Sequence, residues 1–291
     1  MGRIKYLHFF GTSFTAGGGF EWETYKKDNL NKFYGHIDCD KTEFAFSYPG
    51  QLQKLLGDKY IVKNWAKSGY GNDRLCRLVY DIVSDPYFKS EEHLFLFEFA
   101  GLGRKELFFN PLNDYIILNY YLTRNNVPST YARGYAYDTD TERQILESED
   151  KFFQKYTKLV LDEEVEARNI DMMLDFLASF LVNKKVNNVI VSGGLPGNAE
   201  NLIGQNRIKL ENANEFIDIN YYLTGTHKLT ISNETSNGIV DGHFGYYGNK
   251  LGAEVIYNFL VDNKWIDTPK IEINYDFYKN VKVFKQTENL I

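Results

Sequence analysis

Short apolar runs alternate along this chain with stretches in which apolar residues recur at helical spacing. Each apolar run is short enough for a buried strand, and the runs cover residues 4–10, 60–65, 94–99 and 188–191. Helical spacing is found between them, at 48–56 and 74–83. Strands that alternate with helices indicate βαβ units, which build a mainly parallel sheet with helices on its faces. The pattern therefore predicts an α/β fold.

One segment interrupts this alternation. Residues 108–140 are rich in Tyr and Asn, contain Pro111 and Pro128, and show no clean period. We expect an inserted segment there, on the substrate side of the protein or acting as a lid. The stretch that follows, 142–182, has charged residues on one side and apolar residues on the other, which predicts helical structure that packs on the core.

Composition argues against several classes of function. The net charge is −6 and no basic stripe is visible, so we expect no nucleic-acid partner. The chain shows no signal peptide and no apolar run of membrane length, so the prediction is a cytoplasmic protein without a membrane partner. Sequence alone does not pair Cys39 with Cys76, and a reduced protein is expected. The histidines lack metal-ligand spacing, so we predict no metal and no cofactor.

A serine near one end and a histidine near the other are the first candidates for chemistry. Ser13 ends a Gly-Thr-Ser turn directly after the first apolar run, at the edge where open α/β sheets bind ligands. His243 follows Asp241 by two residues and precedes a predicted helix. A serine hydroxyl becomes a good nucleophile when a base takes its proton and a third group orients that base. Taken singly, each motif also fits an ordinary structural turn.

The order of these motifs resembles the SGNH/GDSL hydrolase family, from Phe10 to about Leu260. Residues 11–17 are similar to the family's first block, with Ser13 as the nucleophile and a threonine where aspartate is usual. Residues 64–69 resemble the second block, whose glycine donates a backbone N–H to the oxyanion, and this role falls on Gly69. Asp241 and His243 resemble the last block, where the family more often places the aspartate three residues before the histidine.

The third block is where the chain departs most from the family. The family has Gly-x-Asn-Asp after the third strand, whereas this chain has Gly101, a leucine, Gly103 and Arg104. In this register Gly103 replaces the asparagine that helps to hold the oxyanion. Loss of one such donor typically lowers turnover by ~10² to 10³. Either catalysis is slower, or Arg104 or Asn72 supplies a donor, or catalysis is lost.

The resemblance implies a flavodoxin-like three-layer sandwich that forms one domain over residues 1–291. It also implies a serine esterase acting on a small-molecule or carbohydrate ester, such as an O-acetyl group on a sugar. The same site in an O-acyltransferase, and an inactive binding module, are the alternatives. For Arg104, the alternative to an oxyanion role is a surface ion pair with Glu98 or Glu106. The expected catalytic residues are Ser13, Asp241 and His243, and the expected oxyanion or substrate-binding residues are Gly69, Asn72, Gly101 and Arg104.

Overall fold

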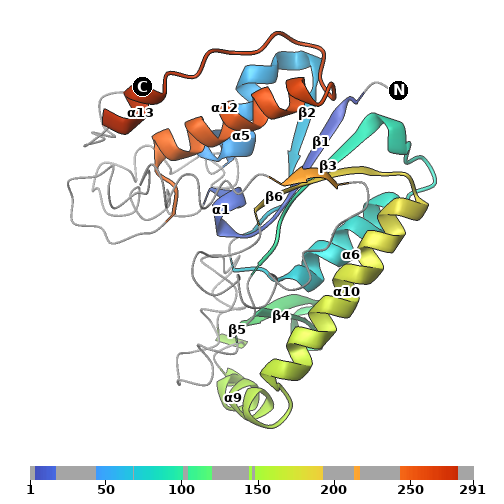
Figure 1. Ribbon diagram of the computed structural model, residues 1–291. Helices are drawn as coiled ribbons and strands as arrows, with labels where there is room; N and C mark the ends of the chain where they lie inside the picture. The colour runs from blue at the N-terminus through green and yellow to red at the C-terminus, as the bar shows by residue number, and fades with distance from the viewer. Residues whose placement is uncertain are drawn as a thin grey trace.

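A five-stranded sheet forms the centre of the protein (Figure 1). The computed structural model describes residues 4–17, 44–67, 69–100, 104–119, 144–145, 148–192, 213–216 and 243–280. The strands are β1 (Tyr6–Phe10), β2 (Ile61–Asn64), β3 (His93–Glu98), β6 (Asn187–Ser192) and β7 (Ala213–Phe216). They lie in the order β2-β1-β3-β6-β7, and all four neighbouring pairs are parallel.

This strand order is the flavodoxin-like arrangement, with the second strand outside the first. Ligands bind such sheets at the carboxyl ends of the strands, at the switch point between β1 and β3. The predicted α/β fold with a mainly parallel sheet is therefore confirmed. Each predicted strand is found within two residues of its expected ends, and β7 is an additional strand.

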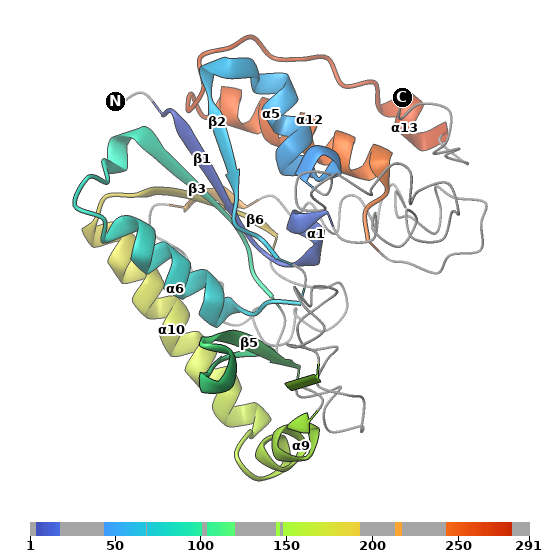
Figure 2. The same cartoon turned by 180° about the vertical axis from the view of Figure 1, so that it is seen from behind.

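Helices cover both faces of the sheet, which makes the three layers expected (Figures 1 and 2). Strand β1 shows why, because Leu7 and Phe9 belong to one apolar core and Phe10 to the other. Successive side chains of a strand point to opposite faces, so one apolar run can serve two cores. The first core includes residues of α5 (Tyr48–Leu56) and α12 (Tyr246–Asp262), and the second includes residues of α6 (Asn72–Val83) and α10 (Glu163–Asn183).

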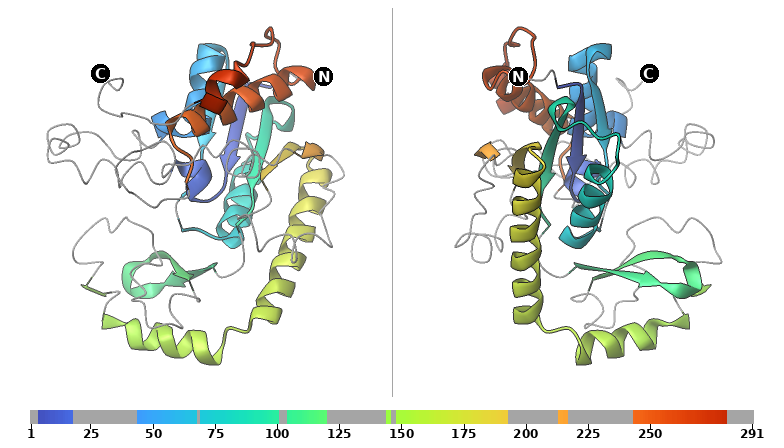
Figure 3. Two further views of the ribbon diagram at one scale, coloured as in Figure 1. Left: turned by 60° about the vertical axis from the view of Figure 1, so that its left-hand side comes forward. Right: turned by 90° about the vertical axis from the view of Figure 1, so that its right-hand side faces the viewer.

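A β-hairpin stands beside the main sheet. Its strands β4 (Arg104–Phe109) and β5 (Asp114–Asn119) are antiparallel. Buried Ile116 and Leu118 pack with Phe153 of α9 (Asp150–Leu159) in a separate apolar cluster, at the end of the molecule away from α12 (Figure 3). The hairpin includes the first residues of the expected insertion, and residues 120–140 lie outside the described part of the chain.

An arginine of α6 fastens this hairpin to the main domain. Arg77 donates two hydrogen bonds to the Glu106 carboxylate, at 2.9 and 2.7 Å, and its guanidinium carbon lies 4.1 Å from the centroid of the Tyr115 ring. A bidentate pair of this kind combines charge with fixed geometry. The hairpin is thereby held against the helix that follows the second predicted motif.

The remaining elements are helical. The stretch predicted as helical over 142–182 contains two helices, because α9 ends at Leu159 and Asp162 caps the start of α10 by accepting from two backbone N–H groups. None of the helices in the described ranges is long and apolar enough to cross a membrane. The other helical elements are α1 (Ser13–Ala16), η1 (Gly57–Lys59), η2 (Ser90–Glu92), η3 (Asn110–Leu112) and α13 (Tyr275–Asn280).

Candidate active site

Ser13 is the first residue of α1, a single helical turn at the carboxyl end of β1. Gly17 ends this turn with φ 92°, a left-handed conformation that favours glycine. Because the first N–H groups of a helix have no helical acceptor, the Ser13 N–H is available to a ligand. It donates to no acceptor among the described residues. The structure thus places the predicted nucleophile at the edge of the sheet where it was expected.

A buried carboxylate holds both sides of this turn. Glu98, at the end of β3, is 2% exposed. It accepts the Thr12 N–H at 3.2 Å, the Thr12 hydroxyl at 2.5 Å and the Thr15 N–H at 2.9 Å, and it also accepts the Thr15 hydroxyl. Hydrogen bonds from four donors offset much of the cost of burying the charge. A side chain at Gly11 would collide with Glu98 and Thr15, so this close approach requires glycine.

A tyrosine extends this hydrogen-bonded group toward α5. The Tyr48 hydroxyl lies 2.5 Å from Oγ1 of Thr15. Burial, reinforced by the nearby Glu98 charge, raises the pKa of Tyr48 well above its ordinary value. Its hydroxyl therefore stays protonated across the working range of pH.

An asparagine then connects α5 to the segment of His243. Asn249 accepts the Tyr48 backbone N–H at 2.8 Å and donates to the carbonyl of Phe244 at 3.1 Å and to that of residue 245 at 3.0 Å. The rings of Phe14 and His243 are 4.8 Å apart between centroids. The segments of the serine and the histidine, far apart in sequence, are thus packed against each other. Asp241, the predicted orienting group, lies outside the described residues.

The loop after β2 is fastened to the same edge of the sheet. The Lys67 N–H donates to the carbonyl of Gly11 at 3.3 Å, and the Asn64 side chain donates to the carbonyl of Thr15 at 3.0 Å. Gly69 has φ 84°, again in the left-handed region. In the described part of the chain its N–H has no acceptor. Its oxyanion role stays a prediction.

Asn72 uses its side chain to hold the backbone that follows β3. Its amide donates to the Ala100 carbonyl at 2.9 Å and its oxygen accepts the Ala100 N–H at 2.8 Å. The oxyanion role predicted for Asn72 would therefore fall to the second proton of this amide. Gly101 and Gly103, from the third predicted motif, lie outside the described residues.

Arg104 opens β4 and lies close to the same edge. Its guanidinium donates to the carbonyl of Tyr70 at 3.4 Å. Burial lowers the pKa of Arg104, and the charge of Glu98 opposes that shift. Arg104 forms no ion pair within the described residues, and Glu106 is paired with Arg77 instead. The alternative of a surface ion pair for Arg104 is therefore wrong, and Arg104 remains an oxyanion candidate.

A small pocket opens between these segments, at the carboxyl ends of β1 and β3. This is the switch point of the sheet, where the strand order predicts a ligand site. Its lining includes Gly11, Thr12, Tyr70, Asn72, Arg74 and Glu98.

Sequence patterns missed the residues that support the site. Glu98 had a visible signal, because it is the one charged residue in the apolar run 94–99. A charge in a strand that is buried on both faces needs partners, and this marks it as a candidate. Tyr48 and Asn249 carried no comparable signal, since both lie within ordinary helical patterns.

No family model matches the chain, and no curated protein matches it. Several solved structures, including the following three, are similar in overall chain course. A protein described as lipolytic, of the G-D-S-L family, from Desulfitobacterium hafniense DCB-2 has 11% identity and a TM-score of 0.43, with 87% of this chain and 98% of that chain covered. The psychrotrophic esterase EstA from Pseudoalteromonas sp. has 9% identity and a TM-score of 0.43, with coverages of 90% and 98%. A carbohydrate esterase, described as having divergent catalytic and non-catalytic binding functions at its active site, has 13% identity and a TM-score of 0.41, with coverages of 91% and 67%.

Proposed function

We propose that the protein is a serine esterase that hydrolyses a small acyl ester. The observation that carries this proposal is the contact between the Phe14 and His243 rings, 4.8 Å apart between centroids. Phe14 follows the candidate nucleophile directly, so the contact brings a serine turn and a histidine together at the ligand-binding edge of the sheet. This is the pairing that nucleophilic ester cleavage requires.

In the proposed mechanism, the Ser13 hydroxyl attacks the acyl carbonyl while His243 accepts its proton. Asp241 orients the imidazole and stabilises its positive charge. The N–H groups of Ser13 and Gly69 hold the oxyanion, with Arg104 as a third donor. His243 then gives the proton to the leaving alcohol, and water releases the acyl group by the reverse sequence of proton transfers.

An O-acetyl ester of a carbohydrate is the substrate that we propose. The pocket beside the serine turn combines the Tyr70 ring with hydrogen-bonding groups such as Asn72, a lining that suits a sugar. Binding sites for small polar molecules commonly combine apolar surface with a few fixed polar groups.

Ser13→Ala tests the nucleophile directly. Turnover of an acetyl-ester panel should fall by at least ~10³ while the thermal melt stays that of the wild type, because loss of the nucleophile removes the covalent step. His243→Asn should also lose most activity, because no base then takes the serine proton. Ser192→Ala is the matched control, since Ser192 also stands at the end of a strand.

Each alternative has its own result in the same assay. Unchanged hydrolysis in Ser13→Ala would remove this serine from the mechanism. If an added sugar acceptor takes the acyl group faster than water does, the protein is an O-acyltransferase. If the wild type turns over no ester on the panel, the protein is a binding module on this fold.

A further inference from the structure

Three positive side chains gather around one tyrosine beside the candidate active site. The Arg74 guanidinium carbon lies 4.5 Å from the centroid of the Tyr70 ring, and Nζ of Lys67 lies 5.4 Å from it. Arg104 donates to the Tyr70 carbonyl. We call these four residues the Tyr70 cluster. Such a concentration of positive charge stands out in a chain whose net charge is −6.

None of these three cations has a carboxylate partner within the described ranges. Arg74 donates to the carbonyl of Trp65 at 2.5 Å and otherwise contacts the Tyr70 ring. Arg77, one helical turn along α6, gives the contrast, because Glu106 binds it with two hydrogen bonds. The arginines beside the pocket are therefore the ones without a paired carboxylate in the described ranges, although the charges of Glu106 and Glu98 act on Arg74 and Arg104 from a distance.

The nearby carboxylates are already engaged. Glu98 accepts four hydrogen bonds from Thr12 and Thr15. Asp73 accepts the backbone N–H of Arg74 at 3.0 Å, and its other oxygen accepts the backbone N–H of Glu106. Both carboxylates thus hold the local backbone and do not pair with a cation of the Tyr70 cluster.

Burial makes these unpaired charges costly. Burial lowers the pKa of Arg74 and that of Arg104 below the ordinary arginine value, which reports that water has been removed from both guanidinium groups. A desolvated cation without a paired carboxylate destabilises a protein unless a partner arrives. A planar guanidinium is suited to a carboxylate, sulfate or phosphate, which it binds through two parallel hydrogen bonds.

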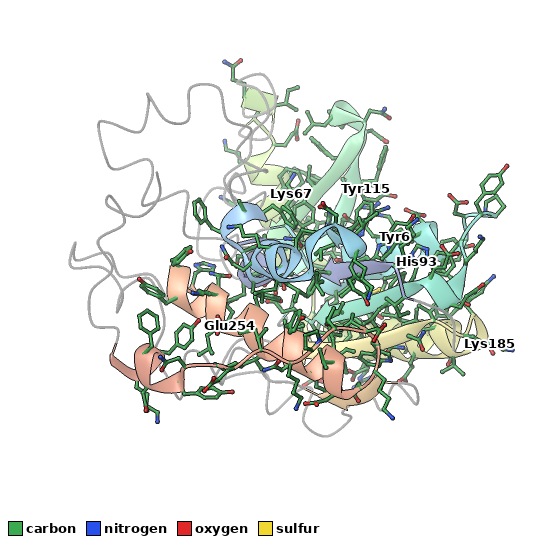
Figure 4. All side chains as sticks on the ribbon, turned by 90° about the horizontal axis from the view of Figure 1, so that it is seen from above. Tyr6, Lys67, His93, Tyr115, Lys185 and Glu254 are labelled. Atoms are coloured by element: carbon green, nitrogen blue, oxygen red, sulfur yellow. The ribbon has the colours of Figure 1, made fainter. Side chains whose placement is uncertain are left out.

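The Tyr70 cluster also faces the reacting end of the molecule. Tyr70 and Arg74 line the same pocket as Gly11 and Thr12, the residues just before Ser13. Figure 4 places Lys67 on the side of the molecule where the β4–β5 hairpin lies, away from Glu254 of α12. An anionic group in this pocket would belong to a molecule that also reaches the serine.

We propose that this pocket is a subsite for an anionic group of the substrate, held by Arg74 and Lys67 beside the Tyr70 ring. The inference rests on the proposed function and deepens it, because it names the substrate class as an ester of an acidic carbohydrate. The anionic group on the sugar is a carboxylate, a sulfate or a phosphate, and all three present negatively charged oxygens to the guanidinium.

Binding tests the subsite without requiring turnover. The Ser13→Ala protein is titrated by calorimetry with D-glucuronate, glucose 6-sulfate, glucose 6-phosphate and, as the neutral reference, D-glucose. We expect at least one acidic sugar to bind about tenfold or more tightly than glucose, an advantage that weakens as salt is added. The three acidic sugars identify which anion the pocket prefers. Equal affinity for all four sugars would overturn the proposal.

Substitutions test whether Arg74 and Lys67 bind the anionic group. Arg74→Gln and Lys67→Gln, made separately in the Ser13→Ala protein, should each reduce the acidic-to-neutral affinity ratio by about fivefold or more. Lys63→Gln is the matched control, because Lys63 also lies over a tyrosine, Tyr6, at 5.3 Å, but Tyr6, unlike Tyr70, does not line the pocket. If Arg74→Gln fails to fold, the Lys67 variant decides. An unchanged ratio in the folded variants would contradict the assignment.

A kinetic ratio separates this inference from the proposed function. This test uses the protein that retains Ser13. The ratio of kcat/KM for 3-acetoxybenzoate to kcat/KM for phenyl acetate isolates the effect of one carboxylate. We expect Lys67→Gln to lower this ratio about fivefold, mainly through KM. If Ser13→Ala hydrolyses both esters like the wild type while acidic sugars still bind selectively, the esterase proposal fails and the subsite stands. If turnover requires Ser13 but the kcat/KM ratio is unchanged in Lys67→Gln, the subsite proposal fails and the esterase proposal stands.

Discussion

Two buried polar clusters lie along β1 and β3, and they meet the cost of burial in different ways. The Glu98 cluster, Glu98 with Thr12 and Thr15, keeps a carboxylate at the carboxyl end of the sheet and surrounds it with donors. The His8 cluster, His8 with Trp65 and His93, consists of rings joined by two hydrogen bonds.

The His8 cluster avoids charge. The Trp65 ring N–H donates to Nδ1 of His8 at 2.9 Å, so the proton of His8 is on Nε2, which donates to Nδ1 of His93 at 2.8 Å. Burial, with smaller contributions from the electrostatic influence of His93 and Lys63, lowers the pKa of His8 to about 3. The cluster therefore needs no counter-ion at neutral pH.

The comparison shows which of these two clusters retains a buried charge. The neutral His8 cluster holds its part of the sheet without a carboxylate. The Glu98 cluster, which lies beside Ser13, retains one. A charge that accepts four hydrogen bonds fixes the backbone more firmly than a neutral group would. We infer that Glu98 is a positioning residue that holds the turn of the candidate nucleophile, and three experiments can break or sharpen this contrast.

The largest effect is expected from Glu98→Gln. The new amide brings N–H groups toward the donors of Thr12 and Thr15, so kcat should fall by ~10² to 10³ as the turn shifts. The free energy of unfolding should fall by roughly 1–3 kcal/mol, because buried donors lose their acceptor.

Steady-state kinetics and chemical unfolding measure the two effects of Glu98→Gln. A positioning role predicts a loss in kcat with little change in KM. Glu91→Gln, in the exposed turn η2 just before β3, is the control and should leave both quantities near the wild type. A folded Glu98→Gln protein with normal kcat would show that the buried charge is structural only.

A smaller effect is expected from Arg104→Ala. If Arg104 donates to the oxyanion, turnover should fall by about 10² with little change in melting temperature, since its one hydrogen bond to Tyr70 is long. Kinetics beside a thermal melt provide the measurement. Turnover like that of the wild type would remove Arg104 from the site and leave Glu98 as the charged group that matters for catalysis.

The smallest catalytic effect is expected from His8→Phe, and its signature is a change in pH dependence. The pKa of His8 is lowered from 6.5 to about 3 in the folded protein, so the unfolded chain binds the proton more readily. His8 therefore contributes stability that is present above pH 6.5 and is lost as pH falls toward 3, at up to ~1.4 kcal/mol per pH unit.

Denaturant unfolding of His8→Phe at several pH values tests this linkage. The variant should lose stability less steeply than the wild type between pH 6.5 and 3, with turnover near neutral pH within about threefold, because a ring of similar size keeps the packing. An unchanged slope would mean that His8 is not the group whose protonation weakens the fold. A large loss of turnover would instead place the His8 cluster within the site.

The sheet and its main helices were predictable because their signal is local. An apolar run reports a strand buried on both faces, and helical spacing reports α5 within the bounds that the structure has. The hairpin was missed because both of its faces are partly covered, so Leu107 and Phe108 follow each other without alternation. The break between α9 and α10 had a signal in Asp162, which caps the second helix.

The candidate site was predictable only where motifs are contiguous. The order of short motifs led to Ser13 and His243, and the structure packs their segments together. Glu98 reaches the serine turn across 83 to 86 positions, so no local pattern reports that contact. Arg104 was foreseen as a candidate, but its neighbour in space, Tyr70, depends on how the hairpin meets the loop after β2.

The bridge made by Asn249 has a consequence for the timing of biosynthesis. The N–H of Tyr48 finds its acceptor 201 positions later in the chain. During translation, β1, β2 and β3 leave the ribosome long before α12, whose residues complete one of the two apolar cores. One face of the nascent sheet therefore stays uncovered until α12 is made, and the candidate nucleophile emerges early while its proposed base emerges late. The proposed site is therefore complete only when nearly all of the polypeptide has been made.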